Sequence, residues 1–557
     1  MKHFAAYGGA EGGRDYNTSE IGERTLWETY LPPFEAAVRA GTGSIMASFN
    51  DIGGTPSHAS RWLLDDVLRR RWSYDGLVVS DWSGIQELIA HGVAATAKDA
   101  VVLAMRAGVD VDMSDALYST HLAALVRAKR VPLALVDSAV KRVLRVKQAL
   151  GLFDDPYRYS NVEREKRLTL SPEYVVAARE AGRKAIILLK NEGGTLPLRK
   201  NLRSIAVIGP LADDARSALG NWAAVGQPKD AVSVLAGLRA AVSSSTHVSY
   251  VRGVPVDTVV TSGFAAAVRA AREADAVVLV LGEREDMSAE AASRASIELP
   301  GSQLALAQAV LRATRAAGSR PRTSVVVVLM NGRPLAIPEL SDEAPAIVES
   351  WFLGVQHGNA VADVLFGDYN PAGRLPVTFP RATGQIPLYY NHKNTGRPAV
   401  AREKYTSKYL DLPWTPLYPF GFGLSYTTFA YKNLQLSTNQ MHPGDTLGVS
   451  VDVTNTGGRV GDEVVQLYIR DDVASVAQPV KALKGFERVT LRTGETKTVR
   501  FKVSAEALAL YDSVLRRVVE PGTFTIYVGG SSESVQQARL TVTGETLVLE
   551  QAPMRAR

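Results

Sequence analysis

Residues 76–81 read GLVVSD, an apolar run of strand length that ends in a carboxylate. Two comparable runs lie on either side of it, at residues 43–50 (GSIMASFN) and 108–114 (GVDVDMS). Amphipathic segments at residues 20–40, 61–71 and 97–107 separate these runs and predict helices. Alternating strands and helices predict a parallel α/β sheet. Asn50 and Asp81 then stand at the carboxyl edge of the strands, where open α/β sheets and barrels place their chemistry.

A second α/β series follows, and after it the pattern changes. Its predicted strands are residues 185–189, 204–209, 276–282, 324–330 and 346–351, and its predicted helices are residues 174–183, 263–274 and 303–317. Beyond residue 429 the helical pattern is replaced by period-two segments at residues 447–453, 463–469, 496–503 and 523–528, with turn sequences between them. Short alternating strands at this spacing are typical of a β-sandwich.

The boundaries between these series predict a multi-domain α/β protein. A polar stretch at residues 156–172 is expected to link the first series, residues 1–155, to the second, residues 173–368. The Gly/Pro-rich residues 369–428 have little periodicity and are expected to wrap around or link the domains. The β-rich region spans residues 429–549, and residues 550–557 are predicted to form a tail.

Composition narrows the class of protein. The 557 residues are 46% hydrophobic and 22% charged, as in folded globular proteins, so disorder is not expected. The net charge of +6 is small for this length and the basic residues form no stripe, which argues against nucleic-acid binding. Without cysteine there is no disulfide, thiolate metal site or cysteine nucleophile. No apolar run reaches the ~20 residues of a membrane helix, and the N-terminus as given has no signal-peptide pattern.

Carboxylates are the best remaining candidates for catalysis. Asp81 is followed directly by Trp82, and an acid beside an indole suits a sugar, whose C–H face stacks on the ring. By itself a strand-end Asp is more often a helix cap or loop acid. Lys2 and His3 could donate hydrogen bonds to hydroxyl groups or could be ordinary terminal residues. The acid-rich residues 282–294 follow a buried-strand pattern, and they could reach a neighbouring domain or form a solvated loop.

Taken together, the motifs of the chain resemble the family 3 glycoside hydrolases of the bacterial periplasmic β-glucosidase type. The resemblance rests on KHFAAYGGAEGG (2–13), VVSDW (78–82), LLKNEGGTLPL (188–198), VIGPLAD (207–213), EAASRASIELPGSQ (290–303), VLMNGRPLAI (328–337), FGDYNPAGRLPVTFPRATGQIPLYYNHKNTGRP (366–398), YPFGFGLSYTTF (418–429) and LKGFERVTL (483–491). It implies a partial (β/α)8 TIM-type barrel, an α/β sandwich domain and a C-terminal fibronectin type III-like β-sandwich.

The resemblance also implies a retaining double displacement by two carboxyl groups from different domains, without metal or other cofactor. Asp81 matches the nucleophile of the family's SDW motif. Glu290, about ten residues before Leu-Pro-Gly, is the best match for the acid/base. Glu283, Glu285 and Glu298 lie in the same region and remain alternatives.

The same resemblance implies the residues that would bind substrate. Lys2 and His3 match the pair that binds sugar hydroxyls, and Trp82 matches the aromatic wall of the subsite. Asp15 and its neighbour Arg14 lie in the loop that follows Lys2 and His3. They are further candidates for substrate binding, with poorer support from the family's motifs.

The departure from the family lies at the front of the chain, which begins directly at the strand bearing Lys2 and His3. Only about half of a barrel is then expected. The sequence is therefore expected to be a fragment or a mis-started reading frame of a longer enzyme, or to be completed by a second chain. As written, the chain is expected to be weakly active at most. The rival from another class is an inactive, carbohydrate-binding or structural remnant.

Within the enzyme interpretation, the expected substrates are β-glucosides and short oligosaccharides with a terminal glucosyl unit. A β-xylosidase or broader exo-β-glycosidase is the nearest alternative. The branch that removes N-acetylglucosamine uses an Asp-His pair after KHF, and residues 8–20 (GGAEGGRDYNTSE) contain no His. The resemblance implies a periplasmic or secreted protein with no nucleic-acid or membrane partner, and it is compatible with a homodimer.

Overall fold

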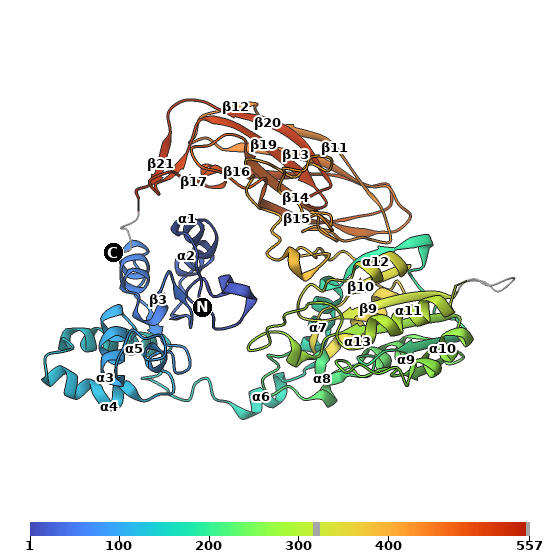
Figure 1. Cartoon of the computed structure of the whole chain (residues 1–557), viewed down its shortest axis with the longest axis horizontal. Coiled ribbons are helices and arrows are strands. Elements are labelled where there is room, and N and C mark those ends of the chain that lie inside the picture. The colour runs from blue at the N-terminus through green and yellow to red at the C-terminus, as the bar shows by residue number, and fades with distance from the viewer. Residues whose placement is uncertain (316–322, 553–557) are drawn as a thin grey trace. The chain divides into compact units, whose positions relative to one another are not determined.

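The computed structural model describes residues 1–315 and 323–552, which form two compact units (Figure 1). The first unit comprises residues 1–167 together with two later segments, residues 509–518 and the described residues from 548 to 552. The second comprises residues 168–508 and 519–547. The predicted tail falls mostly on residues 553–557, which lie outside the described residues.

In the first unit, parallel neighbours follow one another in chain order. Strand β1 (Ser44–Met46) pairs in parallel with β4 (Leu77–Val79). Parallel bridges extend this pair to Phe4, which meets Ala47 on one side, and to Val111, which meets Val79 on the other. The predicted strands 43–50 and 108–114 are therefore shorter than expected.

Helices lie between these parallel segments. They are α1 (Glu23–Thr25), η3 (Leu26–Tyr30), α2 (Pro32–Arg39), η5 (Trp62–Arg71) and α3 (Ala97–Ala107), and a small hairpin joins β2 (Asp51–Ile52) to β3 (Thr55–Pro56). Helices α4 (Leu117–Arg127), α5 (Leu133–Ala149) and α6 (Val162–Leu168) follow the last parallel segment. The predicted helix 97–107 is confirmed: the Thr96 hydroxyl accepts from the Asp99 N–H at its start, and Gly108, at φ 111°, ends it. The predicted helix 20–40 is divided, because Pro32 and Pro33 lack the N–H groups that a continuous helix needs.

Asp110 fixes the last parallel segment to the strand beside it. Its carboxylate, 1% exposed, accepts bonds from Arg69 at 2.7 Å and from Arg142 at 2.6 Å. It also accepts the N–H of Val78 at 2.8 Å, within β4. A carboxylate between two guanidinium groups can be buried because its charge is paired.

The late segments complete the core of the first unit. The small sheet β17 (Leu510–Tyr511), β18 (Arg517–Val519) and β21 (Leu547–Glu550) brings Tyr511 against Trp27, with ring centroids 5.8 Å apart. Arg24 donates to the carbonyl groups of Tyr511 and Asp512. Arg71 pairs with Glu550 at 2.7 Å.

The second unit contains a six-stranded sheet in the order β5-β10-β9-β8-β6-β7. Its strands are β5 (Ile187–Asn191), β6 (Ser204–Ile208), β7 (His247–Val251), β8 (Ala276–Gly282), β9 (Ser324–Met330) and β10 (Ala346–Glu349). All pair in parallel except β5, which is antiparallel to β10. Strand β7 was not predicted, because this edge strand is only partly buried and carries no apolar run.

Successive residues of the central strands enter two different cores, one on each face of the sheet. Helices α9 (Val234–Ala241) and α13 (His357–Leu365) contribute to the core that contains Val278. Helices α10 (Phe264–Glu273) and α11 (Gln303–Ala313) contribute to the core that contains Val277. The remaining helices are α7 (Pro172–Ala185), α8 (Ala215–Ala218) and α12 (Pro338–Glu343). The two buried faces explain why these strands are continuous apolar runs.

The Gly/Pro-rich residues 369–428, all of them described, contain a single short helical turn, η11 (Thr383–Gln385), and no strand. They are held by isolated bridges, in which Leu424 meets Leu188 and Phe379 meets Tyr418. The Arg374 side chain, 9% exposed, pairs with Glu463 at 2.8 Å. This passage therefore connects the parallel sheet to the β-rich region that follows.

Two further sheets follow the Gly/Pro-rich passage, in the orders β11-β13-β16 and β12-β20-β19-β14-β15. Their strands are β11 (Phe429–Leu436), β12 (Gln440–Met441), β13 (Leu447–Asn455), β14 (Gly461–Asp471), β15 (Ala482–Leu491), β16 (Thr496–Val503), β19 (Gly522–Gly529) and β20 (Val535–Val542), with one short helix, α14 (Ala505–Leu508). Strand β13 is buried at every second residue, the pattern that predicted it. Within residues 1–315 and 323–552, no helix is both long and apolar enough to cross a bilayer.

Glu349 is a buried carboxyl group at the end of β10. Its oxygens accept from the Asn331 side chain at 3.1 Å and from the Trp351 N–H at 3.0 Å. Burial raises its pKa to about 8, against the effect of these two bonds, and nearby Glu283 adds to the increase. The folded protein therefore holds a proton that the unfolded chain releases near pH 4.5.

Because the folded state binds more protons between these values, we expect stability to fall as pH rises from about 5 to about 8. Glu349→Gln removes this titration and should flatten the slope of Tm against pH in that window. The measurement is thermal unfolding of both proteins at matched ionic strength from pH 5 to 8. Parallel slopes for the two proteins would show that Glu349 does not hold the proton.

Candidate functional site

Asp81 follows strand β4 at the carboxyl end of the parallel segments and is 7% exposed. Its Oδ1 accepts the Trp82 N–H at 2.8 Å. Its Oδ2 lies 3.5 Å from Nε2 of His3, which follows Lys2 in the parallel segment on the other side of β1. The sheet thus brings together two of the predicted residues that are far apart in sequence.

The buried side chain of His58 binds the backbone of Asp81. Its Nε2 accepts the Asp81 N–H at 2.9 Å, and its side chain is buried. Burial lowers its pKa to about 3, and His91 adds to the shift, so the ring is neutral and can accept this bond. Gly84 allows the ring to fit, because a Cβ there would lie 2.3 Å from His58 Cε1. His58 was not predicted, because its role depends on a contact with a residue 23 positions away.

The other predicted binding residues differ in exposure. Trp82 is 67% exposed, so its indole is available as a stacking surface. Lys2 is exposed, and the His3 ring meets Tyr7 edge-on with centroids 5.1 Å apart. Asp15 lies in the loop before the buried Ser19 and accepts the N–H of the next residue at 3.1 Å.

Glu87 is a carboxyl group near Asp81 that was not predicted. Burial raises its pKa, and repulsion by Asp81 and Asp115 adds to the increase. The half-buried Glu87 therefore belongs to the electrostatic surroundings of Asp81. No apolar pattern marks it in the sequence, because it lies in a loop with a single turn of helix, η6 (Gln86–Leu88).

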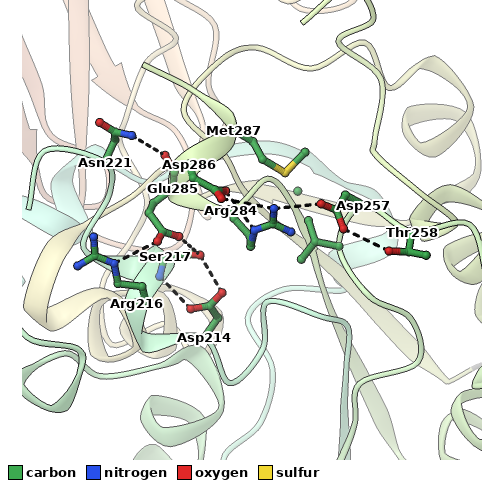
Figure 2. A network of polar contacts seen from close by, with 12 residues as sticks. Asp214, Arg216, Ser217, Asn221, Asp257, Thr258, Arg284, Glu285, Asp286 and Met287 are labelled. Atoms are coloured by element: carbon green, nitrogen blue, oxygen red, sulfur yellow. Dashed lines mark hydrogen bonds and ion pairs between the residues drawn. The ribbon is translucent and has the colours of Figure 1, made fainter. Parts of the chain in front are cut away.

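Glu290 belongs to the second unit, in the loop that follows β8. Two of its rival acids are held by ion pairs at the start of this loop. Glu283 is fully buried between Arg294 and Arg333. Glu285 accepts from Ser217 at 2.7 Å and Arg216 at 3.1 Å (Figure 2).

Figure 2 also shows how the chain between these two acids is fixed. Arg284 pairs with Asp257 at 3.0 Å and with Asp286 at 3.1 Å. The carbonyl of Glu285 accepts from the Asn221 side chain at 3.3 Å. The start of the loop is thus tied to segments that follow β6 and β7.

Glu290 itself is exposed, at the second position of a turn closed by the Ala292 N–H and the Ala289 carbonyl at 3.4 Å. Its neighbours Ala289 and Ala291 have positive φ, at 74° and 56°. Glu298, the remaining alternative, is also exposed, and its carbonyl accepts from Arg294 at 3.0 Å. Of the predicted acids, Glu290 is the one presented at a turn.

Comparison with known proteins agrees with this arrangement of domains. The glycosyl hydrolase family 3 N-terminal and C-terminal domain models match residues 1–146 and 186–426, and a fibronectin type III-like domain model matches residues 463–532. A periplasmic beta-glucosidase of Salmonella typhimurium is 44% identical, over 96% of this chain and 72% of that protein. The chain belongs to glycosyl hydrolase family 3.

Other family 3 proteins extend the comparison. A beta-xylosidase of Formosa agariphila is 41% identical, over 96% of this chain and 74% of that protein. The crystal structure of a beta-glucosidase from Listeria innocua in complex with glucose has a TM-score of 0.92 and 41% identity, over 98% of this chain and 74% of that one. A mutant of the Listeria enzyme was solved in complex with laminaribiose. The predicted family and the fibronectin type III-like C-terminal domain are thus confirmed.

Among residues 1–315 and 323–552, no group of three or more His, Asp or Glu side chains is arranged to hold a metal ion. The side chains placed at Asp81 are an imidazole, that of His3, and the exposed indole of Trp82.

Proposed function

We propose that the protein is a retaining β-glucosidase that removes terminal β-D-glucosyl residues from the non-reducing end of β-glucosides and short oligosaccharides. The observation that carries the proposal is the carboxylate of Asp81 at the carboxyl edge of the parallel segments, with His3 and the exposed Trp82 beside it. The Salmonella and Listeria relatives, both named as β-glucosidases, support the substrate class.

In the proposed mechanism, Asp81 attacks the anomeric carbon while Glu290 protonates the departing oxygen. Glu290 then removes a proton from the water that releases glucose from Asp81, so the configuration is retained. The Trp82 N–H donates to one oxygen of Asp81, and the other oxygen, which lies 3.5 Å from His3 Nε2, is the one assigned to attack the anomeric carbon. No cofactor takes part in these steps.

Glycone binding is assigned to Lys2, His3, Trp82 and Asp15. The first two donate hydrogen bonds to sugar hydroxyl groups, and the indole of Trp82 stacks on the ring face. Asp15 would accept bonds from hydroxyl groups. The exposure of Lys2 and Trp82 is consistent with these roles.

We further propose that the first unit is part of a (β/α)8 TIM-type barrel. The support is its chain-ordered series of parallel neighbours with helices between them, as described above. The proposed domain boundaries are those of the sequence analysis: barrel to residue 155, α/β sandwich at 173–368 and β-sandwich at 429–549. A periplasmic location is proposed from the name of the Salmonella relative, and a homodimer remains a prediction from the family resemblance.

A β-xylosidase is the second candidate, because the Formosa relative at 41% identity carries that name. Hydrolysis of 4-nitrophenyl β-glucoside, β-xyloside and N-acetyl-β-glucosaminide separates the possibilities. We expect the highest kcat/KM on the glucoside. Proton NMR of the first product should show β-glucose before mutarotation, and α-glucose as the first product would refute retention.

A further inference from the structure

Glu283, Arg294 and Arg333 form a buried cluster, which we call the loop clamp. Glu283 directly follows β8, and its carboxylate accepts from Arg294 at 2.5 Å and from Arg333 at 3.2 Å. Both arginine side chains are at most 20% exposed. Charge-assisted hydrogen bonds of this kind are strong, and a buried charge left without its partner is destabilising.

The loop clamp also holds the backbone on both sides of Glu290. Arg333 donates through Nη2 to the carbonyls of Met287 and Ala292, the second at 2.7 Å. Arg294 donates to the carbonyl of Glu298 at 3.0 Å. One buried carboxylate thus orients two guanidinium groups that bind the loop before and after the turn that carries Glu290.

The clamp is itself fixed by the neighbouring strands. Arg333 follows β9, and its carbonyl accepts from the buried side chain of Asn331 at 2.8 Å. The N–H of Glu283 donates to the carbonyl of Met330 at 2.9 Å. Gly332 leaves room for the buried Ser288, because a Cβ at residue 332 would lie 2.2 Å from Ser288 Oγ. The cluster therefore attaches the loop to the ends of β8 and β9.

We propose that the loop clamp positions Glu290 for proton transfer to the leaving group. The inference rests on the proposed function, in which Glu290 is the acid/base. Arg333 is its central positioning residue, because its guanidinium contacts Glu283 and both flanking carbonyls. Lysine at residue 333 would keep the charge but could not make these contacts together, since its ammonium lacks the planar fork.

The test compares Arg333→Lys and Arg294→Lys with Arg203→Lys in the full chain. Arg203 pairs with Asp275 at 2.9 Å, and the two residues directly precede β6 and β8. The loop with Glu290 follows the other end of β8, so Arg203 is a matched control. The readout is kcat/KM for 2,4-dinitrophenyl β-glucoside divided by kcat/KM for phenyl β-glucoside. The 2,4-dinitrophenyl leaving group needs little protonation, whereas phenol needs it. A misplaced Glu290 therefore slows the phenyl substrate more and raises this ratio.

We expect the ratio to rise about tenfold or more in Arg333→Lys and Arg294→Lys, and to stay unchanged in Arg203→Lys. A partly unfolded preparation lowers both rates equally, so the ratio does not depend on the folded fraction. If the ratio is unchanged in both clamp variants but raised in Glu290→Ala, the loop clamp does not position Glu290, and the assignment of Glu290 as the acid/base stands. An unchanged ratio in Glu290→Ala would overturn the assignment of Glu290, and the clamp proposal with it.

Discussion

Asp81→Asn is expected to lower glucoside turnover by several orders of magnitude while the protein stays folded. Asparagine keeps an oxygen that can accept the Trp82 N–H, and the backbone N–H that donates to His58 is unchanged. What it lacks is the anionic oxygen that forms the glycosyl intermediate. The measurement is kcat on 4-nitrophenyl β-glucoside, with circular dichroism and Tm as checks on the fold.

A 2-fluoro glucoside provides a direct chemical check on Asp81. It should label the wild-type protein on a peptide that contains Asp81, and Asp81→Asn should not be labelled. Asp66→Asn is a suitable control, because Asp66 lies on η5 in the same unit and pairs with Arg70 on the same helix. Labelling at another carboxylate would refute the assignment.

Glu290→Ala is expected to have the second-largest effect, and that effect depends on the substrate. Loss of the general acid should abolish most activity on substrates with poor leaving groups and spare more on activated aryl glucosides. Azide should restore rate on activated substrates, because it can replace the water that Glu290 would activate. The product should then be β-glucosyl azide.

Glu298→Ala is the matched control, since this exposed glutamate lies in the same loop. It should keep wild-type rates and show no response to azide. Rescue of Glu283→Ala or Glu285→Ala in place of Glu290→Ala would show that another acid of the loop is the acid/base. Because Glu283 and Glu285 form ion pairs, we expect Glu283→Ala and Glu285→Ala to lower the stability of the protein and to show no rescue by azide.

Much of the architecture could be predicted because burial leaves a clear sequence pattern. Strand β9 lies at its predicted bounds, since both of its faces are covered and its residues form one apolar run. Strand β7 was missed because it is a half-exposed edge. Residues 108–114 contribute a single bridge, because Asp110 uses its side chain to bind Val78.

The candidate site was predictable only where a motif marks it. Asp81 and His3 were found through short motifs, and the sheet accounts for their proximity. His58 and Arg333 act through contacts with residues 23 and 50 positions away, and local sequence gives no sign of these partners. The raised pKa of Glu87 likewise depends on burial and on neighbours that only the fold brings together.

The return of the late segments to the first unit has a consequence for biosynthesis. Trp27 and Arg24 are translated well over 400 residues before their partner Tyr511. Domains generally fold as units during synthesis, with the N-terminal one first. Here the unit that bears Asp81 cannot complete its core until residues 509–518 have been made, so a nascent chain stalled before residue 509 would leave the indole of Trp27 without the ring of Tyr511.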